Sequence, residues 1–292
     1  MTSQISQMTS HESQTTAPNL QIEAANGVTY AYRRFGNTET AALPLVFFVH
    51  FRANLDNWDP LLVDTIAQQR EVILLDNTGV AGSTGTTPGT VEAMALDAIT
   101  FTDALGLRRY DLLGFSLGGF VAQEVALIRP HQARRIVLAG TGPRGGRDMH
   151  VFTRVVLEIA VKAASVAEDL LTIFFEQTVT SQARGREFID RLGSRREDRD
   201  APVSLATRDA HLSAIETWGI PDPTRLNRLA GITQPTLVAN GDNDIMVPTE
   251  NTYLLADHLP SARLSIYPDA GHGFLFQYPV EFGTEVNAFL GQ

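Results

Sequence analysis

The chain of 292 residues, with 43% hydrophobic and 19% charged side chains, has the composition of one large globular domain or of one domain that carries an insertion. Its net charge of −10 excludes nucleic acids and anionic membrane surfaces as expected partners, because both bind basic faces. The absence of cysteine excludes disulfides, thiolate metal sites and a cysteine nucleophile.

Residues 1–19 are rich in Ser, Thr and Gln and contain no apolar run. They are therefore predicted to form a disordered tail, and they lack the apolar segment of a secretory signal. The most apolar stretch, 41–51, is too short to span a bilayer. We expect a cytoplasmic protein.

Short apolar runs and helical patterns alternate along the first half of the chain. Asn26-Gly27 favours a tight turn between two alternating segments, 21–25 and 28–33. Continuous apolar runs predict buried strands at 45–49, 72–75, 110–115 and 136–139. The helical patterns between them cover 60–69, 91–105 and 121–128. This alternation predicts a mainly parallel sheet with helices on both faces.

The alternation stops after residue 143 and resumes with predicted strands at 235–241 and 263–267. Between about 144 and 227 the pattern is helical, with the second helix opened by Ser165 and Glu168 at capping-box spacing. The segments expected to be helical are 151–162, the one after Ser165, 186–192 and 203–218. The charged run 194–200 is predicted to be a solvated connector. We therefore divide the chain into a core, 20–143 and 228–292, and an insertion, 144–227.

One short motif follows the strand predicted at 110–115. The pattern Gly114-x-Ser116-x-Gly118 is typical of a strand–turn–helix nucleophile elbow, in which the serine hydroxyl is exposed on a strained turn. Glycines allow the strand and the helix to approach closely around that residue. The alternative is an ordinary strand–turn–helix connection that contains a serine.

Four local patterns occur in a fixed order along the chain. They are His50 with Trp58 eight residues later, the loop 76–83, the elbow 114–119, and the pair of segments 241–244 and 271–272. With these patterns the chain resembles an α/β-hydrolase-fold enzyme of the serine esterase/lipase-like branch. The resemblance implies a mainly parallel eight-stranded sheet flanked by helices, with the insertion forming a helical cap over the active site.

The resemblance also implies a catalytic triad. Ser116 would be the nucleophile, His272 the base that takes its proton, and Asp244 the acid that orients the imidazole. Asp242 is the competing choice for the acid, although this position more often holds the loop. The order Ser, Asp, His along the chain is the one expected for this fold.

Two backbone N–H groups are expected to form an oxyanion hole. One belongs to Leu117, directly after the nucleophile at a helix N-terminus, and the other to Phe51, in the loop after the third predicted strand. Phe51 stands where many members of the resembling family have Gly. The next residue, Arg52, either projects towards the substrate or pairs with Asp56 or Asp59 at the surface.

Aromatic residues of the insertion are candidates to line a substrate pocket. The alternative is that aromatics at helical spacing pack the insertion on itself. The four candidates are Phe152, Phe174, Phe175 and Trp218.

These observations predict a serine hydrolase that cleaves a small apolar carboxylic ester or lactone through an acyl-enzyme. Four alternatives stay open with the same triad: a carbon–carbon bond hydrolase, an N-acyl amide or acyl-homoserine lactone hydrolase, a cofactor-free perhydrolase of the haloperoxidase type, and a ligand-sensing receptor. No metal ion or cofactor is implied, because the histidines are scattered and no dinucleotide-binding glycine motif follows the first strand. The expected partner is a small-molecule substrate, and the expected assembly is a monomer or homodimer.

Overall fold

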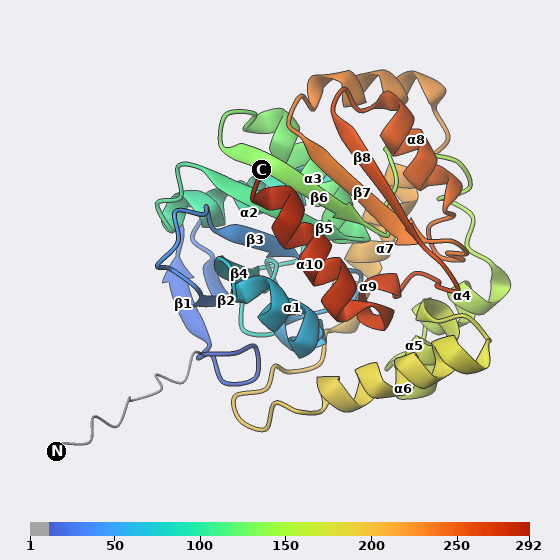
Figure 1. The fold of residues 1–292 in the computed structure, drawn as a ribbon, viewed down its shortest axis with the longest axis horizontal. Helices are drawn as coiled ribbons and strands as arrows, with labels where there is room; N and C mark the ends of the chain where they lie inside the picture. The colour runs from blue at the N-terminus through green and yellow to red at the C-terminus, as the bar shows by residue number, and fades with distance from the viewer. Residues whose placement is uncertain (1–11) are drawn as a thin grey trace, which may run out of the picture.

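An eight-stranded sheet of order β1-β2-β4-β3-β5-β6-β7-β8 runs through the computed structural model, which describes residues 12–292 (Figure 1). β1 and β2 pair antiparallel around the Asn26-Gly27 turn, β2 also pairs antiparallel with β4, and all other neighbouring strands are parallel. The predicted fold, a mainly parallel α/β-hydrolase sheet, is confirmed. The strands are β1 (Leu20–Glu23), β2 (Thr29–Gly36), β3 (Leu45–Phe48), β4 (Glu71–Leu75), β5 (Tyr110–Phe115), β6 (Ala133–Ala139), β7 (Thr236–Gly241) and β8 (Ala262–Tyr267).

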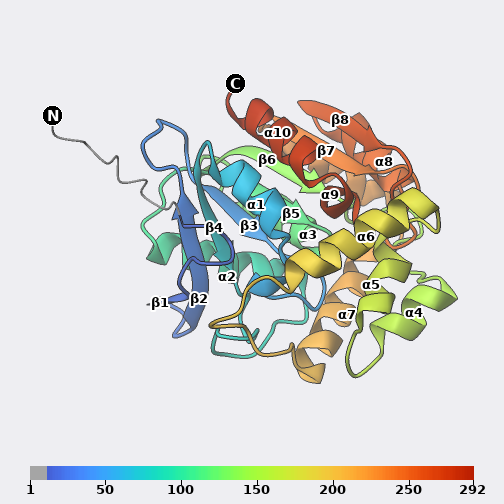
Figure 2. The same cartoon turned by 60° about the horizontal axis from the view of Figure 1, so that its bottom comes forward.

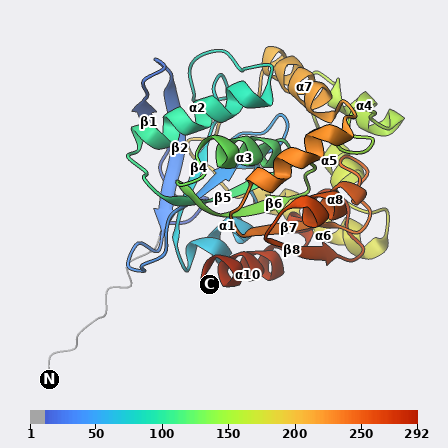
Figure 3. The same cartoon turned by 90° about the horizontal axis from the view of Figure 1, so that it is seen from above.

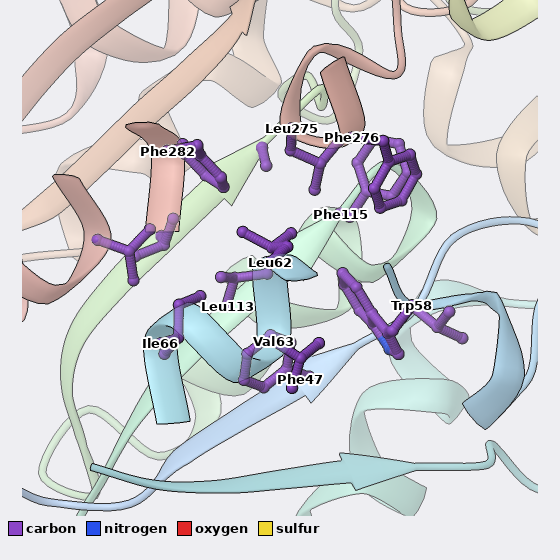
Figure 4. Packing of buried hydrophobic residues seen from close by; sticks show 14 of the residues in the cluster. Phe47, Trp58, Leu62, Val63, Ile66, Leu113, Phe115, Leu275, Phe276 and Phe282 are labelled. Atoms are coloured by element: carbon purple, nitrogen blue, oxygen red, sulfur yellow. The ribbon is translucent and has the colours of Figure 1, made fainter. Parts of the chain in front are cut away.

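Helices cover both faces of the sheet because successive strand residues point to opposite sides. Phe47 and Leu113 pack on one face, whereas their neighbours in sequence pack on the other. Figure 4 shows the first of these cores, to which Phe47, Leu113, Leu62, Ile66 and Phe282 all contribute. The first face carries α1 (Pro60–Ala67) and α10 (Pro279–Leu290); the second carries α2 (Val91–Ala104), α3 (Leu117–Ile128) and α8 (Glu250–His258) (Figures 1 and 3).

The segment between β6 and β7 contains four further helices, which we call the helical insertion. Figure 2 shows them grouped at one end of the sheet. None of the helices between residues 12 and 292 has the length and hydrophobicity needed to cross a bilayer. The insertion comprises α4 (Arg154–Ala160), α5 (Ala167–Phe174), α6 (Val179–Leu192) and α7 (Leu205–Gly219), and the 3₁₀ helix η2 (Pro223–Gly231) leads from it towards β7.

Two helix starts in the insertion differ from the predicted ones. The predicted capping box of Ser165 and Glu168 is wrong: α5 has Val166 as its N-cap, and the Asp169 carboxylate accepts the Val166 N–H at 3.0 Å. α6 begins at Val179, well before residue 186, because the Thr178 hydroxyl accepts the Ser181 N–H at 3.1 Å. The division of the chain into a core and a separate cap domain stays a prediction.

The predicted tail is ordered over the part that the structure describes. Residues 1–11 lie outside the described residues, but the Gln14 side chain donates to the Leu55 carbonyl at 2.7 Å and Ala17 is fully buried. The Arg195 guanidinium donates to the Ala17 carbonyl at 2.9 Å and is itself only 6% exposed. Within the predicted solvated connector 194–200, Arg195 is the exception, because carbonyl oxygens of the N-terminal turn take the place of water around it. Residues 194 and 196–199 are exposed, as predicted.

Candidate active site

Ser116 lies at the sharp turn between β5 and α3, with φ +56° and ψ −119°. Residues other than glycine rarely adopt a positive φ, so the surroundings must hold this backbone in place. The Ser116 N–H donates to the Ala139 carbonyl at 2.9 Å, and its carbonyl accepts the Thr141 hydroxyl at 2.8 Å. A Cβ atom at Gly118 would overlap the Phe48 carbonyl oxygen. Only glycine therefore allows α3 to begin so close to β3.

His272 and Asp244 form a buried pair. His272 Nδ1 lies 2.6 Å from Asp244 Oδ2, and both residues are almost fully buried. The other carboxylate oxygen of Asp244 accepts the N–H groups of Met246 and Val247 at 2.8 and 3.0 Å. These contacts fix the carboxylate. It accepts a hydrogen bond from the Nδ1–H group, which leaves Nε2 as the imidazole nitrogen without a proton.

Asp242, the competing choice for the acid, has a different contact. Its carboxylate accepts the N–H groups of Asp269 and Ala270 at 3.1 and 3.0 Å. It thereby shapes the loop that carries His272, and it does not touch the imidazole. The structure thus places Asp244, rather than Asp242, beside the histidine.

Ser116 and His272 line the same cavity. Within residues 12–292, His272 Nε2 is buried without a hydrogen-bond partner. A nucleophile–base hydrogen bond often tightens only when substrate binds. The ring of His272 packs against both Phe115 and Phe174, with centroid distances of 4.9 and 5.5 Å, so its surroundings are largely apolar.

Two backbone N–H groups lie next to residues that line this cavity or belong to them: those of Leu117, directly after Ser116, and of Phe51. Leu117 is the first residue of α3, where an N–H has no acceptor within the helix. Phe51 follows His50, whose carbonyl accepts the Ala53 N–H at 3.3 Å. Because a trans peptide directs its C=O and N–H to opposite sides, the Phe51 N–H points away from this turn contact. We find no acceptor for it in the described part of the chain, and Phe51 lines the cavity with Ser116.

His50 is a buried residue beside this turn. Its Nδ1 lies 3.0 Å from the Phe51 carbonyl, to which it donates. Burial, together with the nearby His272, lowers the pKa of His50 to about 3, so the ring is neutral.

Two connected cavities meet at Ser116. The larger, about 160 Å³, also reaches His272, Ile159 and Phe174. The smaller, about 30 Å³, is closed by apolar side chains that include Phe152 and Leu212. Both share Phe51, Ser116, Val156, Ala160 and Met246.

The larger cavity leads to a polar outer hollow of about 400 Å³, with which it shares Arg52, Asn57 and Ser165. The three hollows therefore follow one another through shared lining residues, from a polar outer hollow to an apolar inner cavity. A separate hollow of about 270 Å³ at Glu12, Asn37 and Asp64 contains none of these groups.

The aromatic residues predicted to line the pocket divide into two pairs. Phe152 and Phe174 line the cavities. Phe175 and Trp218 do not, which corrects the prediction. Phe175 packs against Phe188 at 5.9 Å, and Trp218 stacks on Phe120 at 5.1 Å with its indole N–H donated to the Gly142 carbonyl at 3.3 Å. Both are packing residues of the insertion and its junction with the core.

Arg52 borders the cavity, as one of the two predictions expected, but it does not pair with Asp56 or Asp59. Asp56 binds Arg33, and Asp59 binds Arg191, both in buried or half-buried ion pairs. The Arg52 guanidinium instead donates to main-chain carbonyls just after α4, although its side chain does border the cavity. The acidic partners expected from the sequence are already occupied by arginines that come from elsewhere in the fold.

Several cavity residues were missed by sequence reasoning. Met246 and Val247 come two and three residues after Asp244, and this position close to the acid is a signal that could have found them. No comparable signal marks those from the insertion and its flanks, which are Met149, Val156, Ile159, Ala160, Leu170, Ile173, Leu212 and Ile215. Among residues 12–292, no three His, Asp or Glu side chains gather in a way that would hold a metal ion.

Known proteins match this chain over most of its length. The family model described as alpha/beta hydrolase fold matches residues 44–279, and the chain therefore belongs to the α/β-hydrolase family and is a hydrolytic enzyme. A solved α/β hydrolase fold protein from Chitinophaga pinensis is 42% identical, with a TM-score of 0.89, over 96% of this chain and 99% of that one.

Two curated relatives carry more specific names. A protein of Rhizobium rhizogenes named as a carbamate hydrolase, RutD, is 26% identical over 80% of this chain and 87% of its own length. A pimeloyl-[acyl-carrier protein] methyl ester esterase of Nitrosomonas europaea is 31% identical over 64% of this chain and 75% of its own length.

Proposed function

We propose that the protein is a serine esterase that cleaves a small apolar carboxylic ester through Ser116, His272 and Asp244. The observation that carries the proposal is the buried His272–Asp244 pair at 2.6 Å, whose imidazole borders the same cavity as Ser116 on its strained turn. The names of the two curated relatives support it. A carbamate and a methyl ester both present a carbonyl carbon with a heteroatom leaving group.

In the first step, the Ser116 hydroxyl attacks the ester carbonyl carbon while His272 Nε2 takes its proton. Asp244 holds the Nδ1 proton and stabilises the imidazolium. The carbonyl oxygen becomes negatively charged and accepts hydrogen bonds from the N–H groups of Phe51 and Leu117. Each such donor contributes about 3 kcal/mol or more to transition-state stabilisation.

The tetrahedral intermediate then collapses. The carbon–oxygen bond to the alcohol breaks, the imidazolium returns its proton to the leaving oxygen, and an acyl-Ser116 ester remains. Water activated by the same imidazole hydrolyses this ester, which releases the carboxylic acid and restores the serine.

The two cavities suggest how an ester is oriented. Of the two cavities, only the larger shares lining residues with the outer hollow, namely Arg52, Asn57 and Ser165. An alcohol leaving group placed there can depart while the acyl group stays on Ser116 in the smaller, apolar cavity. Because that cavity holds only about 30 Å³, the proposal favours short acyl chains. A cytoplasmic location and a monomeric or dimeric state also remain proposals.

The test is hydrolysis of p-nitrophenyl acetate, butyrate and octanoate by wild type, Ser116→Ala and the control Ser261→Ala, which changes an exposed serine before β8. We expect Ser116→Ala to lower kcat about 10⁴-fold or more, as removal of a triad nucleophile does elsewhere. Ser261→Ala should match wild type, and acetate should be preferred over octanoate.

Hydrolysis by Ser116→Ala at more than a tenth of the wild-type rate would refute the serine mechanism. The receptor alternative predicts a different result, namely a rise in Tm on ligand addition without turnover of any ester.

A further inference from the structure

The turn that presents the Phe51 N–H has an unusual backbone. The Ala53 N–H to His50 carbonyl contact closes a four-residue turn, and Arg52, its third residue, has φ +56°. A positive φ at this position defines a type II turn and favours Gly or Asn. Arginine pays a conformational cost there, so other contacts must hold the turn in this form.

The peptide between Phe51 and Arg52 is held by a histidine on each side. His50 Nδ1 donates to the Phe51 carbonyl at 3.0 Å, and the Arg52 N–H donates to His211 Nδ1 at 3.2 Å. His211 comes from α7 of the helical insertion and is fully buried, and burial lowers its pKa to about 4. Its Nδ1 can therefore act as an acceptor at neutral pH.

The Arg52 side chain makes a second set of contacts with the insertion. Its guanidinium donates to the carbonyls of Ala160 at 3.3 Å, Lys162 at 2.8 Å and Ala163 at 3.0 Å. These carbonyls end and follow α4, where a helix leaves its last carbonyls without intrahelical partners and a cation is favourable. One residue of the turn is therefore bound to both α4 and α7.

We propose that Arg52 is a positioning residue: its contacts with α4 and with His211 hold the turn in the form that aims the Phe51 N–H at the oxyanion. This inference rests on the proposed function. Return of Arg52 to a negative φ would turn the 51–52 peptide over and break both histidine contacts. The turn would change shape, and an oxyanion donor must stay within about 0.5 Å of its productive position. The docked insertion thus completes the oxyanion hole as well as covering the cavity.

The first test separates the backbone from the side chain at residue 52. Arg52→Ala and Arg52→Gly both remove the guanidinium, but only glycine accepts φ +56° without strain. We expect Arg52→Ala to lower kcat roughly ten-fold with little change in KM, since a left-handed conformation is disfavoured by about that factor for alanine. Arg52→Gly should stay within about three-fold of wild type.

The second test changes the acceptor in α7. His211→Asn keeps an oxygen near the place of Nδ1 and should keep kcat, whereas His211→Leu removes the acceptor and should lower kcat roughly ten-fold. The Ki of a trifluoromethyl ketone, whose serine adduct carries an oxyanion, should rise in parallel with each loss of kcat. A merely structural role would not link Ki to kcat while KM stays constant.

Equal kcat values for Arg52→Ala and Arg52→Gly, or an unchanged kcat in His211→Leu, would overturn the proposal. Both variants lack the guanidinium contacts, so both should lose a similar amount of stability, measured as Tm. A difference in kcat between Arg52→Ala and Arg52→Gly at similar Tm therefore reports the backbone of the turn and not a general loss of stability. Failure of the proposed function looks different. In that case Ser116→Ala still hydrolyses the ester and the ketone forms no adduct.

Discussion

Ser116 and Arg52 both have φ +56°, a positive value that is strained for residues other than glycine, and both border the same cavity. Their supports differ. The elbow is surrounded by its own glycines and by core contacts to β6 and Thr141. The Arg52 turn has no glycine, and much of its support comes from α4 and α7, more than a hundred residues further along the chain.

Backbone strain can be recognised in a sequence only where neighbouring residues accommodate it. The elbow should therefore keep its shape when the insertion is perturbed, whereas the turn of residues 50–53 should not. The following predictions challenge or refine this comparison.

The largest effect is expected at the elbow itself. In Gly118→Ala the new Cβ would overlap the Phe48 carbonyl oxygen, which belongs to the rigid sheet. We expect loss of almost all esterase activity and a marked fall in Tm, because α3 cannot start in its place. Hydrolysis of p-nitrophenyl acetate and thermal unfolding of the purified variant measure the activity and the Tm.

Gly106→Ala is the matched control. Gly106 has φ +69° but open space around its Cβ position, so alanine there meets only backbone strain. It should lower stability by about 1 kcal/mol and leave kcat unchanged. Similar behaviour of the two variants would show that close approach to β3 is not what Gly118 provides.

An intermediate effect on stability is expected from a change of pH, through the two histidines that contact the turn of residues 50–53. The pKa values of His50 and His211 fall to about 3 and 4 in the folded protein, below the usual 6.5. The unfolded chain therefore binds more protons below pH 6.5, and the free energy of unfolding should decrease as pH falls towards 4.

In His211→Asn this decrease should be shallower by up to about 1.4 kcal/mol per pH unit, the contribution of one proton. Asp200 acts in the opposite sense. Burial raises its pKa to about 6, so the folded protein gains stability as that carboxyl protonates, equally in both proteins. Urea unfolding at pH 7, 6 and 5 measures the difference. Parallel profiles would contradict a buried, neutral His211.

The smallest effect is expected from the side chain of Phe51. Its ring borders both cavities and lies 6.1 Å from the His211 ring, whereas its proposed role in catalysis uses only the backbone N–H. Phe51→Ala should change kcat for the acetate ester by less than about five-fold and shift preference towards butyrate or octanoate, because the cavity grows. A loss as large as that of Ser116→Ala would show that the ring itself is required for catalysis.

Much of the fold was predictable because strand and helix periodicity are local properties. Alternating segments around Asn26-Gly27 marked the first two strands, and the strands predicted further along the chain matched the other six. Gly114 and Gly118 marked the elbow. Helix boundaries in the insertion were less predictable. At α5 the capping side chain is Asp169, and several neighbouring polar residues had suitable spacing.

Local patterns along the chain are sufficient to predict the order of the strands and helices, the strained serine turn, and the set of residues from which an active site can form. The contacts between distant segments become known from the folded chain: Asp244 rather than Asp242 meets His272, Arg52 binds the end of α4, and Trp218 packs away from the cavity. The cause of this division is separation along the chain. Backbone conformation depends on near neighbours, whereas these contacts join segments that meet only after the insertion packs onto the sheet.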